Sequence, residues 1–135
     1  MPDTTLTVLV YSDDLDVRGQ VRTALGRRVA RDLPELQFVE VATEPAVFRA
    51  LKDGVDLAIL DGEAVPAGGM GICRQMKDEV FNAPPVLVLV GRAQDAWLAT
   101  WSRADAVVPH PLDPMQLANS VAQLLRPAHA LTPTS

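Results

Sequence analysis

The stretch AILDGEAVPAGGMG, residues 58–71, runs from three apolar residues directly into an aspartate, Asp61. The apolar run has the pattern of a buried strand. An acid at the end of such a strand is uncommon, because a buried charge is costly unless it is paired or used. We therefore predict that Asp61 is a functional residue or the relic of one, with capping of the following helix as the alternative.

The loop that follows contains Glu63, one proline and the glycines Gly68, Gly69 and Gly71. Glu63 is interpreted as a solvated loop residue. No Lys-Ser/Thr pair follows the glycines, and their spacing fits no dinucleotide-binding fingerprint. The glycines therefore predict a turn and not a phosphate-binding loop.

Apolar runs and helical patterns alternate on both sides of this stretch. Predicted strands cover residues 6–11, 38–41, 55–60, 86–90 and 106–108, and predicted helices cover about 14–29, 43–54, 70–81, 94–103 and 113–126. The run VLVLV (86–90) shows no polar alternation, which is typical of parallel strands covered on both faces. Five such units predict an α/β fold, an open five-stranded parallel sheet in the order 2-1-3-4-5 with helices on both faces. Residues 1–126 form one predicted domain, and residues 127–135 a disordered tail.

Polar residues follow several of the predicted strands. Ser12 and Asp13 come after the first strand, Asp61 after the third and His110 after the fifth. In an open parallel sheet, functional groups gather at the carboxyl ends of the strands. We therefore expect Asp13, Asp61 and His110 to cluster at one edge of the sheet.

Composition excludes several classes of protein. The chain has 135 residues, of which 48% are hydrophobic, and a net charge of −5. This acidic balance argues against a nucleic-acid partner, because phosphate contacts need a clustered basic surface. No apolar run approaches the ~18 residues of a membrane span, and residues 1–8 lack the pattern of a secretion signal. We expect no membrane partner and a cytoplasmic location. The single cysteine, Cys73, is predicted to be a core residue.

The residues at the strand ends and their spacing resemble the CheY-like receiver domain of bacterial response regulators over about residues 6–126. The features that carry the resemblance are SDD (12–14) with Val17-Arg18 downstream, DLAILD (56–61), Gly69 eight residues after Asp61, PPVLVLV (84–90) and HPLDPMQL (110–117). The resemblance implies a flavodoxin-like fold in which Asp61 accepts a phosphoryl group from a histidine kinase. It further implies that Asp13, Asp61 and the backbone carbonyl of Glu63 hold Mg²⁺, with Ser12 at the position of a second metal-binding acid.

The chain departs from the receiver pattern at positions that hold the phosphoryl group or carry the switch. The resemblance implies Ser or Thr where Val90 stands, an aromatic residue at Val107, and Lys where His110 precedes Pro111. A Lys would donate a charge-assisted hydrogen bond, whereas a histidine is mostly neutral near pH 7. Losing one charged and one neutral hydrogen bond costs about 2–4 kcal/mol, or about 30- to 1,000-fold in phosphoryl transfer or retention. We therefore expect phosphorylation and Mg²⁺ binding to be weak or absent.

Trp97 and Trp101 stand four residues apart on a predicted helix and so share one of its faces. They are either core residues or an exposed site for a protein partner. The resemblance implies that receivers use the face made by the fourth helix, fifth strand and fifth helix for contacts. We predict that this face mediates homodimer formation or partner binding independently of phosphate.

The leading hypothesis is an atypical single-domain receiver in two-component or phosphorelay signalling, which acts as a protein-interaction module and not as an enzyme. One alternative is a flavodoxin-like nucleotide-binding protein or enzyme that uses the acidic strand ends. A Ser-His-Asp order and a phosphate loop, which would favour it, are missing from the sequence. The other alternative is a structural adaptor whose acidic edge is vestigial.

Overall fold

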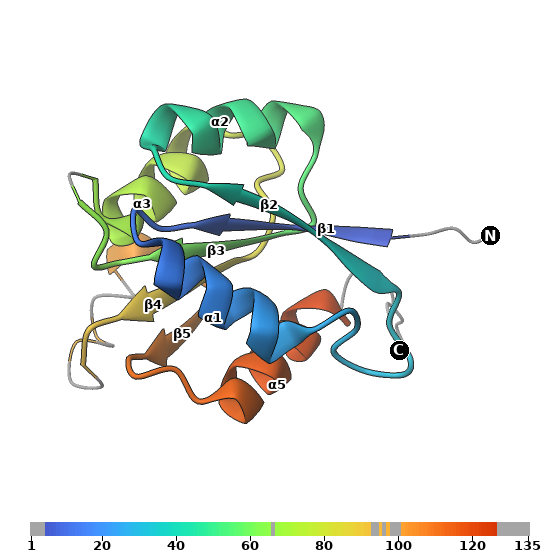
Figure 1. Ribbon diagram of the computed structural model, residues 1–135. Coiled ribbons are helices and arrows are strands. Elements are labelled where there is room, and N and C mark those ends of the chain that lie inside the picture. The colour runs from blue at the N-terminus through green and yellow to red at the C-terminus, as the bar shows by residue number, and fades with distance from the viewer. Residues whose placement is uncertain (1–4, 66, 93–94, 96, 98–100, 127–135) are drawn as a thin grey trace.

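A computed structural model describes residues 5–65, 67–92, 95, 97 and 101–126 of the chain (Figure 1). Its centre is a five-stranded sheet in the order β2-β1-β3-β4-β5, with every pair of neighbours parallel. The strands are β1 (Thr5–Tyr11), β2 (Glu35–Val41), β3 (Leu57–Asp61), β4 (Val86–Val90) and β5 (Ala106–Pro109). This topology confirms the predicted fold class and strand order.

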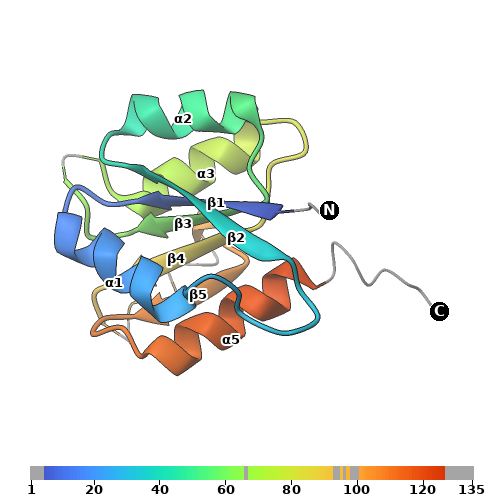
Figure 2. The same cartoon turned by 45° about the vertical axis from the view of Figure 1, so that its right-hand side comes forward.

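Helices cover both faces of the sheet. They are α1 (Leu15–Leu25), α2 (Glu44–Asp53), α3 (Gly69–Glu79) and α5 (Pro114–Leu125). Figures 1 and 2 show α1 and α5 on one face and α2 and α3 on the other. None of the helices in the described part of the chain has the length and hydropathy of a membrane span.

The sheet separates two hydrophobic cores. Val8 and Val10 point into the core beneath α1 and α5, while Leu9 and Tyr11 point into the core beneath α2 and α3. Every residue of β3 and β4 is buried. Because a fully buried Val or Leu side chain contributes about 1.5–3 kcal/mol, the central strands are anchored on both sides. This anchoring fixes the carboxyl ends of β1 and β3 beside each other.

The first turns of three helices carry side-chain caps. Asp14, Thr43 and Asp113 each accept a hydrogen bond from a backbone N–H of the helix that follows, and a proline stands in the first turn of α2 and of α5. Such a cap satisfies backbone donors that have no partner within the helix. The predicted starts of α2 and α5 are confirmed.

Three predicted boundaries were wrong. The first helix ends at Leu25 and not at residue 29, because Gly26 adopts a φ of 62° and its N–H bonds to the carbonyl of Arg22. The second strand begins at Glu35, earlier than predicted. The third covers residues 57–61 and so includes Asp61 as its last residue. Half of the predicted helix 94–103 and all of the predicted tail 127–135 lie outside the described residues.

Candidate functional site

Ser12 and Asp61 meet at the carboxyl ends of two neighbouring strands. Tyr11 lies opposite Leu60 in the β1–β3 register. The residues that follow them, Ser12 just after β1 and Asp61 at the end of β3, therefore lie side by side. Both are buried, at 0% and 3% exposure. The Ser12 hydroxyl donates to Asp61 Oδ2 at 2.7 Å and accepts from the N–H of Asp14 at 3.0 Å. One side of the Asp61 carboxylate is thus satisfied by a neutral hydroxyl.

The other Asp61 oxygen faces the β3–α3 loop and the end of β5. The Glu63 N–H donates to Asp61 Oδ1 at 2.9 Å. His110 Nε2 lies 3.5 Å from the same oxygen and forms an ion pair with it only when the imidazole is protonated. A hydrogen bond from the His110 N–H to the Val90 carbonyl at 2.8 Å holds His110 in place, and the peptide bond before Pro111 is cis.

Asp13 is exposed beside this pair, and its Oδ1 accepts from the N–H of Val65 at 3.2 Å. The Tyr11 hydroxyl donates to the Ala67 carbonyl. These two contacts tie the β3–α3 loop to the end of β1. Burial raises the pKa of Tyr11, and the negative charges of Asp13 and two other acids raise it further. The structure therefore brings together Asp13, Asp61 and His110, as predicted.

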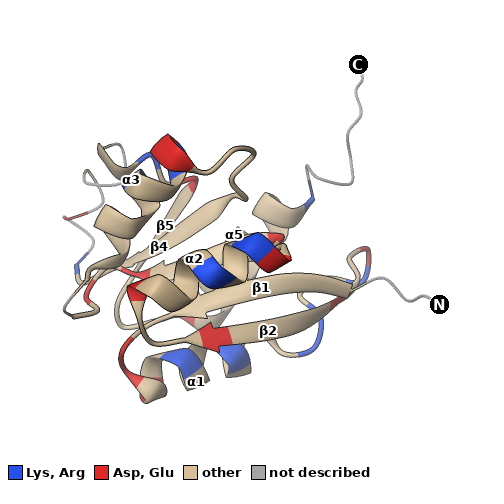
Figure 3. Cartoon of the chain, turned by 90° about the horizontal axis from the view of Figure 1, so that it is seen from above, with Lys and Arg blue, Asp and Glu red and all other residues tan. Residues whose placement is uncertain are grey.

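An ionic cluster anchors the turn that contains Ser12. Arg18 Nη1 donates to the Ser12 carbonyl at 2.6 Å, and Arg18 Nε donates to Glu40 Oε1 at 3.3 Å. Glu40 on β2 also pairs with Arg22, so one acid on the strand lies beside two basic residues of α1 (Figure 3). In the sequence, Arg18 is only one of the features that carry the resemblance to receiver domains, and this contact was not predicted.

The acidic cluster opens into a cleft of about 440 Å³, lined by Asp13, Asp14, Val17, Asp61, Glu63, Gly91 and His110. Glu63 is exposed, as predicted, and its carboxylate lies over Gly91. A Cβ at position 91 would sit 2.8 Å from Glu63 Cδ, the far end of a flexible side chain that would have to move aside. Gly91 was not predicted as a site residue. Its position directly after β4 was the signal in the sequence that could have identified it.

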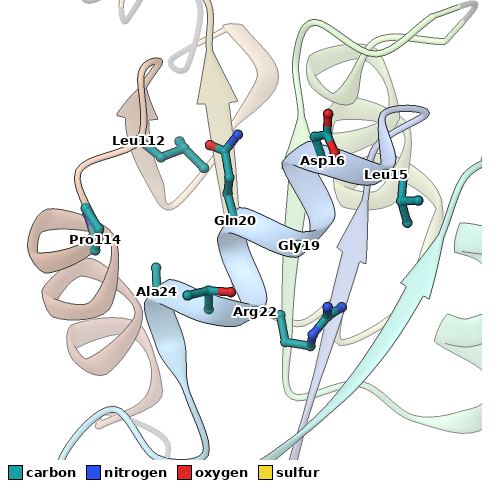
Figure 4. Close-up of a pocket in the computed structure, with 9 residues that line it drawn as sticks. Leu15, Asp16, Gly19, Gln20, Arg22, Ala24, Leu112 and Pro114 are labelled. Atoms are coloured by element: carbon teal, nitrogen blue, oxygen red, sulfur yellow. The ribbon is translucent and has the colours of Figure 1, made fainter.

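A larger groove of about 690 Å³ lies between α1 and the start of α5. In Figure 4, Leu112 and Pro114 stand across from Gln20 and Ala24, with Leu15 and Asp16 at the upper end of α1. Its lining lacks the grouped acids and the histidine that surround Asp61. The chemistry of the molecule is therefore concentrated in the smaller cleft.

Of the four positions predicted to depart from the receiver's phosphoryl-holding and switch pattern, Val90, Val107, His110 and Pro111, the first two carry valines inside the fold. Val90 is 0% exposed, and Val107 packs against the core beneath α2 and α3. Neither side chain can donate a hydrogen bond, and neither has an aromatic ring that could alternate between an inward and an outward position. The cleft consequently offers no hydroxyl from position 90.

The donor set for a cation is small. Among the described residues, no group of three or more His, Cys, Asp or Glu side chains is arranged to hold a metal ion. Asp13 and Asp61 are the two carboxylates at the place where the resemblance implies Mg²⁺. One oxygen of Asp13 already accepts from Val65, and Ser12 already donates to Asp61. Hard cations favour several anionic oxygens, and this arrangement offers fewer of them than such a cation prefers.

The two tryptophans are exposed, which rules out their interpretation as core residues. Trp97 is 69% exposed and Trp101 is 49% exposed. The Arg74 guanidinium of α3 lies 5.0 Å from the Trp101 ring centroid, and its Nη1 donates to the Trp101 carbonyl at 2.6 Å. Trp101 thus lies against α3. Phe81, just beyond the end of α3, is 91% exposed.

Comparisons with known proteins agree on one family. No protein-family model matches the chain. Uncharacterized response regulatory proteins from two strains of Mycobacterium tuberculosis are each 59% identical over 133 residues, which is 96% of this chain and 100% of theirs. A putative response regulator from Chloroflexus aurantiacus superposes with a TM-score of 0.77 at 20% identity, covering 91% of this chain and 99% of that one. The chemotaxis response regulator CheY4 of Vibrio cholerae gives 0.71 at 19% identity, covering 90% and 100%.

Proposed function

The chain belongs to the response regulators and is a receiver domain of two-component signal transduction, and from this premise we propose that it acts chiefly as a protein-interaction module whose Asp61 is phosphorylated weakly or not at all. The proposal takes residues 1–126 as the receiver domain and assigns it no catalytic activity of its own. A cytoplasmic location is part of the same proposal.

One observation carries this proposal: the Asp61 carboxylate is already satisfied, while the groups that would hold a phosphoryl group are missing. Ser12 donates to one Asp61 oxygen and the Glu63 N–H to the other. Val90 offers no donor to a phosphoryl oxygen, and His110 approaches Asp61 at 3.5 Å with a charge that depends on protonation. The pocket favours the free carboxylate over its phosphorylated form.

Phosphorylation would place a large negative charge in this cleft. In the transfer step, an Asp61 oxygen would attack the phosphorus of the donor, and the bond from phosphorus to the donor atom would break. The product carries nearly two negative charges beside Asp13. Mg²⁺, which Asp13, Asp61 and the Glu63 carbonyl would hold, offsets this charge when it is bound. Ser12 in place of a second carboxylate weakens that binding and therefore the stabilisation of the product.

Receivers interact with histidine kinases and with other proteins, and the surface of this chain supports a protein partner. We assign the contact to the face formed by the segment between β4 and β5, together with β5 and α5, as a homodimer or partner interface. The exposure of Trp97 and Trp101 supports this assignment, because large exposed aromatic side chains are typical of interface centres. The contact of Trp101 with α3 extends the proposed surface toward that helix.

The proposal is tested by restoring the missing groups. The triple variant Ser12→Asp, Val90→Thr and His110→Lys returns a metal-binding carboxylate, a hydroxyl and an ammonium group. We expect the wild type, incubated with acetyl phosphate and Mg²⁺, to gain little or no phosphoryl adduct of about 80 Da by intact mass. The triple variant should be labelled clearly.

Adding Asp61→Asn to the triple variant is the control, and it should abolish the label. Strong labelling of the wild type would refute the proposal. A folded triple variant that stays unlabelled would show that the missing groups are not what limits Asp61.

A further inference from the structure

The main chain of Ser12 is held on both sides by groups outside its own strand. Its N–H donates to the carbonyl of Val41 at the end of β2, at 3.2 Å. Its carbonyl accepts from Arg18 Nη1 at 2.6 Å. With both backbone groups fixed, the position of the Ser12 Cβ is fixed, and the hydroxyl can satisfy its neighbours by rotation about a single bond.

Arg18 is itself held in place. Its side chain is 15% exposed, and its Nε donates to Glu40 on β2. A guanidinium is a planar fork, so binding a carboxylate through one nitrogen fixes the direction of the others. The carboxylate of Glu40 therefore directs the Arg18 Nη1 toward the Ser12 carbonyl.

We infer that Arg18, oriented by Glu40, is a positioning residue that holds Ser12 so that its hydroxyl covers Asp61. The order of contacts is Glu40 to Arg18, Arg18 to the Ser12 carbonyl, and the Ser12 hydroxyl to Asp61 Oδ2 at 2.7 Å. This inference deepens the proposed function, on which it rests for the importance of Asp61. These contacts determine how a phosphodonor or a cation can reach the Asp61 carboxylate.

Two backbone amides report on this arrangement without any ligand. The Asp14 N–H donates to the Ser12 hydroxyl and the Glu63 N–H donates to Asp61. Arg22 provides a matched control, because it pairs with the same Glu40 from the same helix and is more exposed, at 52%. Arg18 and Arg22 therefore share Glu40 as a partner. The hydrogen bond to the Ser12 carbonyl is donated by Arg18.

The experiment compares Arg18→Gln and Arg22→Gln by amide NMR, without Mg²⁺ or a phosphodonor. Arg18→Gln should shift the Asp14 and Glu63 amide resonances and speed exchange of the Asp14 amide about tenfold, which corresponds to the loss of one hydrogen bond. Arg22→Gln should leave both amides near their wild-type positions. In a Ser12→Ala background, Arg18→Gln should cause no further shift at Glu63, because the connecting hydroxyl is absent.

Equal shifts in Arg18→Gln and Arg22→Gln, or none in either, would overturn the inference. An Arg18→Gln shift that persists unchanged in the Ser12→Ala background would also overturn it. If Arg18→Gln does not fold, Glu40→Gln takes its place: it should shift the same two amides in the same direction, and unchanged amides would reject the inference. These readouts need no phosphoryl transfer, so their failure is distinct from a failure of the labelling experiment.

Discussion

Ser12 stands where the resemblance to receiver domains implies a carboxylate. Asp61 therefore contacts a hydroxyl at the end of β1 and not a second acid. Two acids at this distance would repel each other and favour a cation between them. Ser12 instead donates a hydrogen bond to Asp61 Oδ2, which stabilises the ionised carboxylate without a metal. The identity of one side chain thus determines that Asp61 meets a hydrogen-bond donor here and not a second acid.

Tyr11 offers a direct test of the electrostatics at this edge, because it is the only tyrosine in the chain. Burial and the nearby acids raise its pKa from 10.0. Absorbance near 295 nm should therefore titrate with a midpoint above pH 10 in the folded protein and at about pH 10 in concentrated urea. A folded midpoint at or below 10 would contradict the arrangement of acids around the ring.

The same shift has a consequence for stability. Because the folded pKa is the higher one, the contribution of Tyr11 is fully present below about pH 10 and is lost as the pH rises through the folded value. Tyr11→Phe should flatten the alkaline decline of the free energy of unfolding over that window. Urea titrations at several pH values, with the wild type in parallel, measure this effect, and an unchanged decline would exclude Tyr11 as its source.

At the scale of the elements, α3 begins directly against the end of β3. A Cβ on Gly69, its first residue, would lie 2.8 Å from the backbone carbon and oxygen of Asp61. Helix and strand therefore touch through main-chain atoms, and only glycine permits the contact. Two residues further along, a Cβ on Gly71 would meet nothing within 4 Å.

These two glycines form a matched pair for mutation. Gly69→Ala should destabilise the protein by about 1–3 kcal/mol, because backbone must move to admit the methyl group. Gly71→Ala should stabilise it by up to about 1 kcal/mol, because alanine is the better helix former and the space is open. Urea denaturation measures both changes. Equal effects of the two substitutions would contradict the close packing of α3 on Asp61.

At the scale of the whole molecule, the acidic cleft and the surface that carries the tryptophans lie at different places on the fold. The cleft lies at the carboxyl ends of the strands, whereas Trp101 lies against α3 and pairs with Arg74. Val90 has no hydroxyl and Val107 has no aromatic ring. The pair therefore cannot form the hydroxyl-and-aromatic switch that would couple Asp61 to the tryptophan surface. Trp97 and Trp101 are exposed without phosphorylation of Asp61. Binding at this surface would therefore not require phosphorylation.

The tryptophan surface predicts self-association that depends on concentration. Trp97→Ala and Trp101→Ala, made singly, should each weaken it by about thirtyfold in Kd, since truncating an interface hot spot costs about 2 kcal/mol or more. Sedimentation or light scattering measures the effect. Leu15→Ala is the control, because Leu15 is similarly exposed at 68% but is the first residue of α1, outside the segments that form the proposed interface. A wild type that stays monomeric, or variants that associate like it, would leave the tryptophans without this role.

The sequence alone determined the features that depend on local pattern. Apolar runs without alternation identified the parallel strands, and side chains such as Thr43 and Asp113 marked the helix starts, because periodicity and caps act within a few residues. The strand ends then placed Asp13, Asp61 and His110 at one edge through topology.

Only the tertiary structure decided which groups meet there. The hydroxyl of Ser12 reaches Asp61 across 49 residues of sequence, and the N–H of Val65 reaches Asp13 across 52. Such contacts depend on strand register and on the direction of each side chain, which local pattern does not encode. The same holds for Arg18: its guanidinium is aimed by Glu40 on a neighbouring strand, and that strand lies beside α1 only after the sheet has assembled.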